Sequence, residues 1–157
     1  MKRIIILLIV VCLSSITMAQ KILQNGHYVV QKSNDVCWLY DEDGRYTGLF
    51  GKSITLLRNG HYIVQKSNDV DWLYDEDYKY TGLFGESITL LRNGHYVIQK
   101  SNDVGWLYDE DYKYTGLFGK SITLLRNGSY CVQKNSNSYW IYDSDYKYTG
   151  INGKDPC

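Results

Sequence analysis

The sequence has little proline, few cysteines and no excess of charge of either sign. One proline and 14 glycines among 157 residues exclude proline-rich linkers and collagen-like chains. Basic and acidic side chains number 17 each, so the basic surface that binds nucleic acid or anionic lipid is missing. Hydrophobic residues make up 44% and charged residues 22%, which supplies enough apolar surface for a folded core. We therefore expect one globular domain and no nucleic-acid partner.

Long hydrophobic runs are confined to the first residues. Lys2 and Arg3 precede an apolar run of ten residues at 4–13, and small residues lead to a cleavage position after Ala19. This order is typical of a signal peptide. The run has about half of the ~20 residues that span a bilayer, which disfavours the alternative of a retained anchor. We predict a signal peptide at 1–19, a secreted, periplasmic or cell-surface location, and no transmembrane span in the mature chain.

The remainder of the sequence repeats one unit four times with a period of 34 residues. Each copy carries an Asn-Gly pair, at Asn25, Asn59, Asn93 and Asn127, and a tryptophan, at Trp38, Trp72, Trp106 and Trp140. No linker separates the copies, which predicts a single repeat domain over 20–157. Its units cover about 20–51, 52–85, 86–119 and 120–153, followed by a short tail at 154–157.

The chemistry within each unit favours strands, although the helical tetratricopeptide repeat has a similar period. Turn-forming sequences recur every 8 to 10 residues, and the runs between them are rich in Val, Ile, Thr, Tyr and Trp. Over the 34-residue period that starts at Asn59, these runs predict four strands, at 62–66, 70–74, 79–83 and 87–92. The connections are too short for crossovers, so the strands should be antiparallel. The Asn-Gly pair favours a type I′ hairpin turn, and Phe84-Gly85 predicts a further turn.

Alternation along the strands predicts which side chains face inward. We expect Trp72, Tyr74 and Phe84 to be core residues rather than a ligand platform. The position before each tryptophan accepts four different residues and should be exposed; it holds Cys37, Asp71, Gly105 and Tyr139. The apolar neighbours Ile63 and Val64 point to opposite faces, which indicates that the first strand is buried on both. Such units must stack, which predicts an all-β fold of four units, closed as a small propeller or open as a solenoid-like array.

The tryptophan strand and the turn after it carry a resemblance to known repeats. Residues 38–45, preceded by Tyr28-Val29-Val30, resemble the WG repeat of bacterial secreted and surface-associated proteins. The segment is also similar to choline-binding cell-wall repeats, through Trp38, Tyr40, Gly44 and the Thr47-Gly48 pair. Leucine stands where the WG repeat has its glycine. The resemblance implies a binding or scaffold role and carries no catalytic residue over.

Loss of the signal segment removes Cys12, whose lipidation is disfavoured by the large Val11, and leaves Cys37, Cys131 and Cys157. An exported protein with three cysteines can form one disulfide. A Cys131–Cys157 bond would close a loop inside the last unit, and a Cys37–Cys157 bond would join the two ends. Three unpaired thiols are the third possibility. No cysteine or histidine spacing typical of a metal site occurs, and we expect no cofactor.

Histidines and acidic turns also repeat. His27, His61 and His95 follow the Asn-Gly pair, and acidic runs such as Asp75-Glu76-Asp77 recur in the turns. The histidines have no fixed acidic partner, and the turns lack the twelve-residue calcium-loop pattern. We interpret both as solvated turn residues and leave calcium binding at the turns open. Catalysis needs unlike groups at one site, which near-identical units do not supply, so we expect no enzyme.

Aromatic turn residues are the remaining candidates for ligand contacts. A turn position that is Gly44 in the first unit holds tyrosine in the others, where the ring either is exposed or lies over its own hairpin. Tyrosine stacks on sugar rings and anchors protein partners. The predicted ligand-contact residues are Tyr78, Tyr112, Tyr146, Tyr139, His61 and His95. We predict a non-catalytic exported protein that binds a surface glycan or a protein through repeated aromatic contacts. The alternative is a structural or self-associating surface module.

Overall fold

The computed structural model describes residues 20–100, 103–135 and 137–154. The predicted signal peptide at 1–19 lies outside these residues. Within them the chain forms strands β1 to β16 and no helix, which confirms the all-β prediction. It follows that no described segment is a helix with the length and apolarity needed to cross a membrane.

The strands form four antiparallel sheets of four strands, each in chain order. The first sheet contains β1 (Gln20–Ile22), β2 (Tyr28–Ser33), β3 (Val36–Tyr40) and β4 (Tyr46–Gly51). The second contains β5 (Ser53–Leu56), β6 (Tyr62–Gln65), β7 (Asp71–Tyr74) and β8 (Tyr80–Gly85). The third contains β9 (Ser87–Leu90), β10 (Tyr96–Lys100), β11 (Val104–Tyr108) and β12 (Tyr114–Gly119). The fourth contains β13 (Ser121–Leu124), β14 (Tyr130–Asn135), β15 (Ser138–Tyr142) and β16 (Tyr148–Gly153).

The predicted four-stranded antiparallel unit is confirmed, with local differences. Phe84 and Gly85 were predicted to form a turn, but they are the last residues of β8. The ladder with β7 continues to its end, where Gly85 pairs with Asp71. The next sheet begins at Ser87, so a single residue, Glu86, separates the two sheets.

The Asn-Gly turns also differ from the type I′ prediction. A type I′ turn needs positive φ at both central residues. Only the glycine has it, with φ of 89° at Gly60. The amide of Gly60 donates to the carbonyl of Leu57 at 3.1 Å, and the amide of Leu57 donates to the carbonyl of His61 at 2.8 Å. This is the three-residue hairpin loop in which a type I turn is followed by a left-handed residue.

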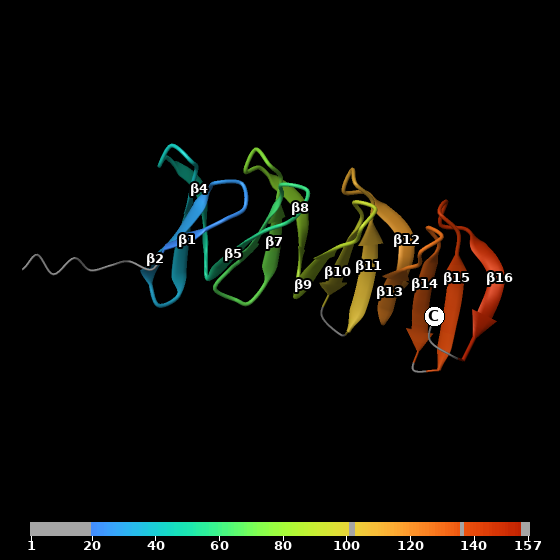
Figure 1. The fold of residues 1–157 in the computed structure, drawn as a ribbon. Helices are drawn as coiled ribbons and strands as arrows, with labels where there is room; N and C mark the ends of the chain where they lie inside the picture. Colours follow the sequence, from blue (N-terminus) through green and yellow to red (C-terminus); the bar gives the residue numbers. More distant parts are fainter. Residues whose placement is uncertain (1–19, 101–102, 136, 155–157) are drawn as a thin grey trace, which may run out of the picture.

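The sheets stack in an open row. Figure 1 shows them in chain order from the blue first sheet to the red fourth, with the first and last at opposite ends. At each junction the third strand of one sheet contacts the first strand of the next, and the fourth contacts the second; β3 with β5 and β4 with β6 are the first example. Consecutive sheets are therefore offset by two strands. Of the two arrangements left open by the sequence, the structure is the open array.

Leucines and β-branched residues fill the junctions between sheets. At the first junction Leu39 and Leu49 of the first sheet cluster with Ile54 and Val64 of the second. Leu39 and Val64 are 0% exposed. Burial of each such side chain stabilises the fold by about 1.5–3 kcal/mol. The same cluster recurs at the other two junctions, so every core is shared by two units.

Glycines at the ends of the fourth strands allow the sheets to approach. A Cβ on Gly85 would lie 2.6 Å from Cγ2 of Ile98 in the next sheet and would overlap the carbonyl oxygen of Gln99. The amide of Glu86, next along the chain, donates to that same carbonyl at 2.8 Å. Backbone therefore meets backbone at the junction, and Gly51 and Gly119 occupy the equivalent places.

The predicted faces of the tryptophan strand are reversed. The face that was expected to be exposed carries Leu73, which is 0% exposed. On the same face of the first unit, Cys37 is 7% exposed. The side that was expected to be core carries Trp72, which is only half-buried, and its cross-strand partner Phe84, which is 46% exposed. The two-strand offset explains the reversal. The third and fourth strands of each sheet pack their leucine face on the next sheet, and their tryptophan face extends beyond the preceding sheet.

Candidate functional site

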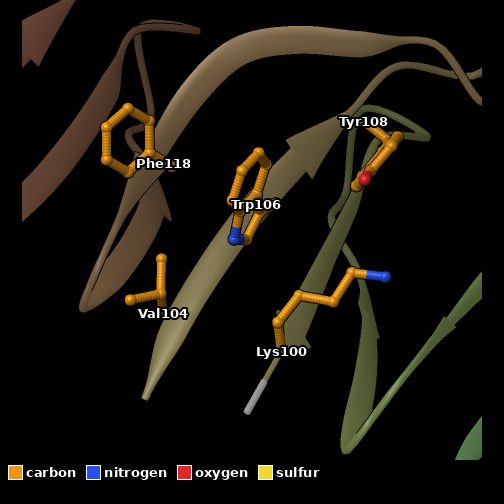
Figure 2. Close-up of a pocket in the computed structure, with 5 residues that line it drawn as sticks. All are labelled: Lys100, Val104, Trp106, Tyr108 and Phe118. Atoms are coloured by element: carbon orange, nitrogen blue, oxygen red, sulfur yellow. The ribbon is translucent and has the colours of Figure 1, made fainter. Parts of the chain in front are cut away.

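The aromatic side chains that extend beyond the neighbouring sheet form a groove. In the third unit the groove has a volume of about 420 Å³ and is lined by Lys100, Val104, Trp106, Tyr108 and Phe118. Figure 2 shows Trp106 in the middle, with Phe118 on one side and Lys100 and Tyr108 on the other. The ring centres of Trp106 and Phe118 are 5.7 Å apart.

We call this set of five positions the aromatic groove, and the repeat supplies equivalent residues in the other units. The second unit supplies Lys66, Val70, Trp72, Tyr74 and Phe84. The first unit supplies Lys32, Val36, Trp38, Tyr40 and Phe50. The fourth unit keeps Lys134, Trp140 and Tyr142 but has Ser138 and Asn152 in place of valine and phenylalanine.

The phenylalanines are the most exposed apolar members of the grooves. Phe50 is 51% exposed, Phe84 46% and Phe118 47%. Large apolar side chains exposed at the same place in successive units are a feature of binding surfaces. Each tryptophan is held from the side by a tyrosine of the fourth strand, as where the rings of Trp106 and Tyr114 lie 5.0 Å apart. The rings therefore have fixed orientations before any ligand arrives.

A lysine at the edge of each of the last three grooves reaches the preceding sheet. Its ammonium group donates to the carbonyl of the preceding phenylalanine, from Lys66 to Phe50 at 3.0 Å and from Lys100 to Phe84 at 2.6 Å. The same ammonium lies over the ring of that phenylalanine, 4.3 Å from its centre for Lys100. Burial lowers the pKa of Lys66, Lys100 and Lys134 from the ordinary lysine value.

A second repeated cluster lies at the junctions, near the Asn-Gly turns. The hydroxyl of Tyr96 accepts a hydrogen bond from Nδ2 of Asn59 at 2.6 Å and lies 2.6 Å from Nδ1 of His61. Tyr112, from the acidic turn of the same unit as Tyr96, packs its ring 5.9 Å from that of His61. We call each set of asparagine, histidine and two tyrosines a junction latch.

The junction latches explain where most of the predicted ligand-contact residues lie. Tyr78, Tyr112 and Tyr146 are half-buried against a histidine of the preceding unit. His61 and His95 each face a tyrosine hydroxyl of the next unit. Tyr139 lies apart from them, half-buried in β15 opposite Gly153. The structure thus brings five of the six residues into latches, with Tyr139 outside. Their role as ligand contacts stays a prediction.

The histidines are not the solvated turn residues that the sequence suggested. His27, His61 and His95 are half-buried, and burial lowers the pKa of His61, while Glu76 and Asp75 oppose that shift. Among the described residues, no three histidine, cysteine, aspartate or glutamate side chains converge as a metal site would require. Calcium binding at the acidic turns stays an open prediction.

Neither Cys37 nor Cys131 is a member of an aromatic groove. Cys37 is a buried free thiol, so the predicted Cys37–Cys157 alternative is not formed. Cys157 lies outside the described residues, and its pairing with Cys131 stays a prediction. Cys131 itself is buried in β14.

The groove lysines and exposed phenylalanines were missed by sequence reasoning. Their signal was present, since lysine recurs at Lys32, Lys66, Lys100 and Lys134 with the tryptophan period. Alternation alone could not show that half of one sheet face is uncovered, because that depends on the two-strand offset between sheets.

No protein-family model and no curated protein sequence matches this chain. Among solved structures the fold is similar to the WD40 β-propeller domain of Doa1, with a TM-score of 0.39 and 12% sequence identity. The match covers 86% of this chain and 52% of that one, so this chain spans about half the length of the solved structure.

Proposed function

We propose that this chain is an exported, non-catalytic protein that binds a repetitive surface glycan in its aromatic grooves. The observation that supports the proposal is the row of half-exposed tryptophan, tyrosine and phenylalanine rings at equivalent places in successive units. Flat aromatic faces stack on the apolar faces of sugar rings, while tyrosine hydroxyls and the lysine donate hydrogen bonds to sugar oxygens. A fold built from repeats suits a ligand that also repeats.

The spacing of the grooves supports a polymer rather than a single sugar. Stacked sheets lie about 10 Å apart and neighbouring strands about 4.8 Å apart, and because consecutive sheets are offset by two strands, equivalent grooves are separated by more than one sheet spacing. The four sheets lie in one row in Figure 1. A linear polysaccharide can therefore meet several grooves in succession, and each further groove adds avidity without a new kind of contact.

The first test measures binding as a function of glycan length. The mature chain is screened against linear polysaccharides on an array, and hits are titrated by calorimetry with oligosaccharides of increasing length. We expect affinity to rise steeply once an oligosaccharide reaches from one groove to the next. Failure to bind any polysaccharide would contradict the proposal.

A variant taken from the chain's own fourth unit tests the site. Asn152 already stands where the other units have phenylalanine, so Phe50→Asn, Phe84→Asn and Phe118→Asn should leave the strands intact. We expect the triple variant to bind at least about tenfold more weakly, because three stacking surfaces are lost. Ile22→Asn removes another exposed apolar side chain, 73% exposed and outside the grooves, and should bind like the unaltered chain.

A further inference from the structure

We infer that the glycan held by the aromatic grooves is acidic and places an anionic group, a carboxylate or a sulfate ester, beside the groove lysines. This inference rests on the proposed function and adds the ligand's charge to it. The evidence is the position of one ammonium group at the edge of each of the three grooves at the junctions, those of Lys66, Lys100 and Lys134.

These three lysines have no carboxylate partner among the described residues. Ion pairs in that part of the chain join Arg45 to Asp43, Lys52 to Asp69, Lys79 to Asp77 and Lys113 to Asp111. The groove lysines instead contact a carbonyl oxygen and aromatic rings, which leave a net positive charge at a half-buried place. An anion at the groove would offset the desolvation of that charge.

The same contacts disfavour a cationic ligand. In the second unit the ammonium of Lys66 lies 4.8 Å from the ring centre of Phe50, 5.8 Å from that of Trp72 and 5.5 Å from that of Tyr74. The chain's own cation therefore occupies the place over the rings where a ligand cation would bind. A neutral glycan would use the rings but leave the charge unmatched.

The acidic turns are kept away from these lysines. Lys100 ends β10, and the acidic turn of its unit begins at Asp109, after β11. Successive turns of an antiparallel sheet lie at opposite ends of the strand between them. The groove lysine and the acidic turn are therefore separated by the length of β11. At the lysine end an aspartate follows the groove lysine by three residues: Asp69 in the second unit, where it is paired with Lys52, and Asp103 in the third.

One unit contains a natural exception that sharpens the test. Glu86 lines the space between the second and third sheets together with Lys100 and Phe84. The equivalent residues at the other two junctions are Lys52 and Lys120. Glu86 therefore lowers the positive potential at one groove, and Glu86→Lys would make that junction like its neighbours.

The experiment compares two forms of one polymer on the mature chain. The probes are a polygalacturonate and the same polymer after its carboxyl groups have been reduced to alcohols. At low salt we expect the acidic form to bind roughly tenfold more tightly, as several weak ion pairs would give. The difference should shrink as salt is added. A sulfated galactan decides between the anions: tighter binding than polygalacturonate identifies sulfate, and weaker binding identifies carboxylate.

Matched variants locate the charge. Replacing Lys66, Lys100 and Lys134 together by glutamine keeps a donor for each phenylalanine carbonyl and removes the charge. This triple variant should lose the preference for the acidic polymer, measured as the ratio of its affinities for the two polymers, so that a loss of lysine hydrogen bonds common to both polymers cancels. The control variant replaces Lys79, Lys113 and Lys147, which lie at the acidic turns, by glutamine. It removes the same number of positive charges and should keep the preference for the acidic polymer. Glu86→Lys leaves all groove contacts in place and should bind the acidic polymer several-fold more tightly.

The possible failures are distinguishable. Equal binding of the acidic and reduced polymers overturns the inference and leaves the proposed function standing. Equal losses in the groove and control triples, or no gain with Glu86→Lys, also overturn it. If neither these polymers nor any glycan on the array binds, the proposed function itself fails.

Discussion

At the scale of single residues, the hydroxyl of Tyr96 joins two side chains of the preceding unit. Nδ2 of Asn59 can only donate to that oxygen, so the hydroxyl hydrogen is free to be donated to Nδ1 of His61. This order fixes the neutral histidine tautomer with its hydrogen on Nε2. Burial raises the pKa of Tyr96 to about 12, so the hydroxyl keeps its hydrogen.

Protonation of His61 should weaken the fold in acid. Burial holds the pKa of His61 below its ordinary value, so the unfolded chain takes up its proton first as the pH falls. Stability is therefore retained above about pH 6.5, the ordinary histidine pKa, and is lost as the pH falls from there through the folded pKa. Urea unfolding at about pH 7.5 and about pH 5 measures the loss. His61→Gln, which keeps an acceptor and cannot titrate, should show a smaller pH dependence.

Replacement of a junction glycine tests the close approach of backbones. Gly85→Ala would place its Cβ 2.6 Å from Cγ2 of Ile98, and we expect a loss of about 1–3 kcal/mol in the free energy of unfolding. Gly105→Ala is the matched control, because its Cβ would come closest to a movable side chain, Val97, at 3.1 Å, and the nearest backbone atom, the carbonyl oxygen of Gly119, lies at an ordinary contact distance of 3.6 Å. Its effect on the urea midpoint should be much smaller. Equal losses would contradict the proposed contact.

At the scale of strands and sheets, the sequence predicted the elements well and their faces poorly. Turn residues and β-branched runs are local signals, which is why four strands per unit could be placed from a single repeat period. The inner and outer faces of β7 depend on how far the next sheet overlaps it. Leu73 and Trp72 are both apolar neighbours in one strand, so alternation could not decide which faces a core.

The candidate site shows the same limit. Repetition correctly indicated that aromatic side chains recur, and it missed that the turn tyrosines pack into junctions. Tyr112 adopts a left-handed backbone with φ of 65°, where the first unit has Gly44. A position with that φ normally favours glycine. The ring contact with His61 accounts for the tyrosine, and a residue of the preceding unit is invisible to a local pattern.

Truncation of β-strand side chains should confirm the observed faces. Leu73→Ala removes a side chain that is 0% exposed, and we expect it to cost about 2–5 kcal/mol. Phe84→Ala removes a larger side chain that is 46% exposed, yet we expect less than about 1.5 kcal/mol. Denaturant unfolding of both variants makes the comparison. A larger loss for Phe84→Ala would restore the original prediction of an aromatic core.

At the scale of the whole molecule, each core is built from two sheets, so no unit holds a core of its own. The cluster at the second junction joins Leu73 and Leu83 of one unit to Ile88 and Ile98 of the next. We expect the third unit alone, residues 86–119, to stay unfolded, and the pair 52–119 to show a cooperative transition by circular dichroism. A cooperative transition in the single unit would contradict the shared core.

Each end face of the array lacks one of the residues that form a junction latch. The first unit has Gly44 where later units have the latch tyrosine, and the last unit has Ser129 where earlier units have the histidine. Stacking of a second copy end to end would therefore form a junction without its histidine–tyrosine contact. Gln20 also stands where inner units have Ile54, which makes the first end face more polar. We expect light scattering to give a monomer mass that does not change with concentration. Mass that grows with concentration would instead favour self-association through these faces, and Gly44→Tyr combined with Ser129→His should then strengthen it.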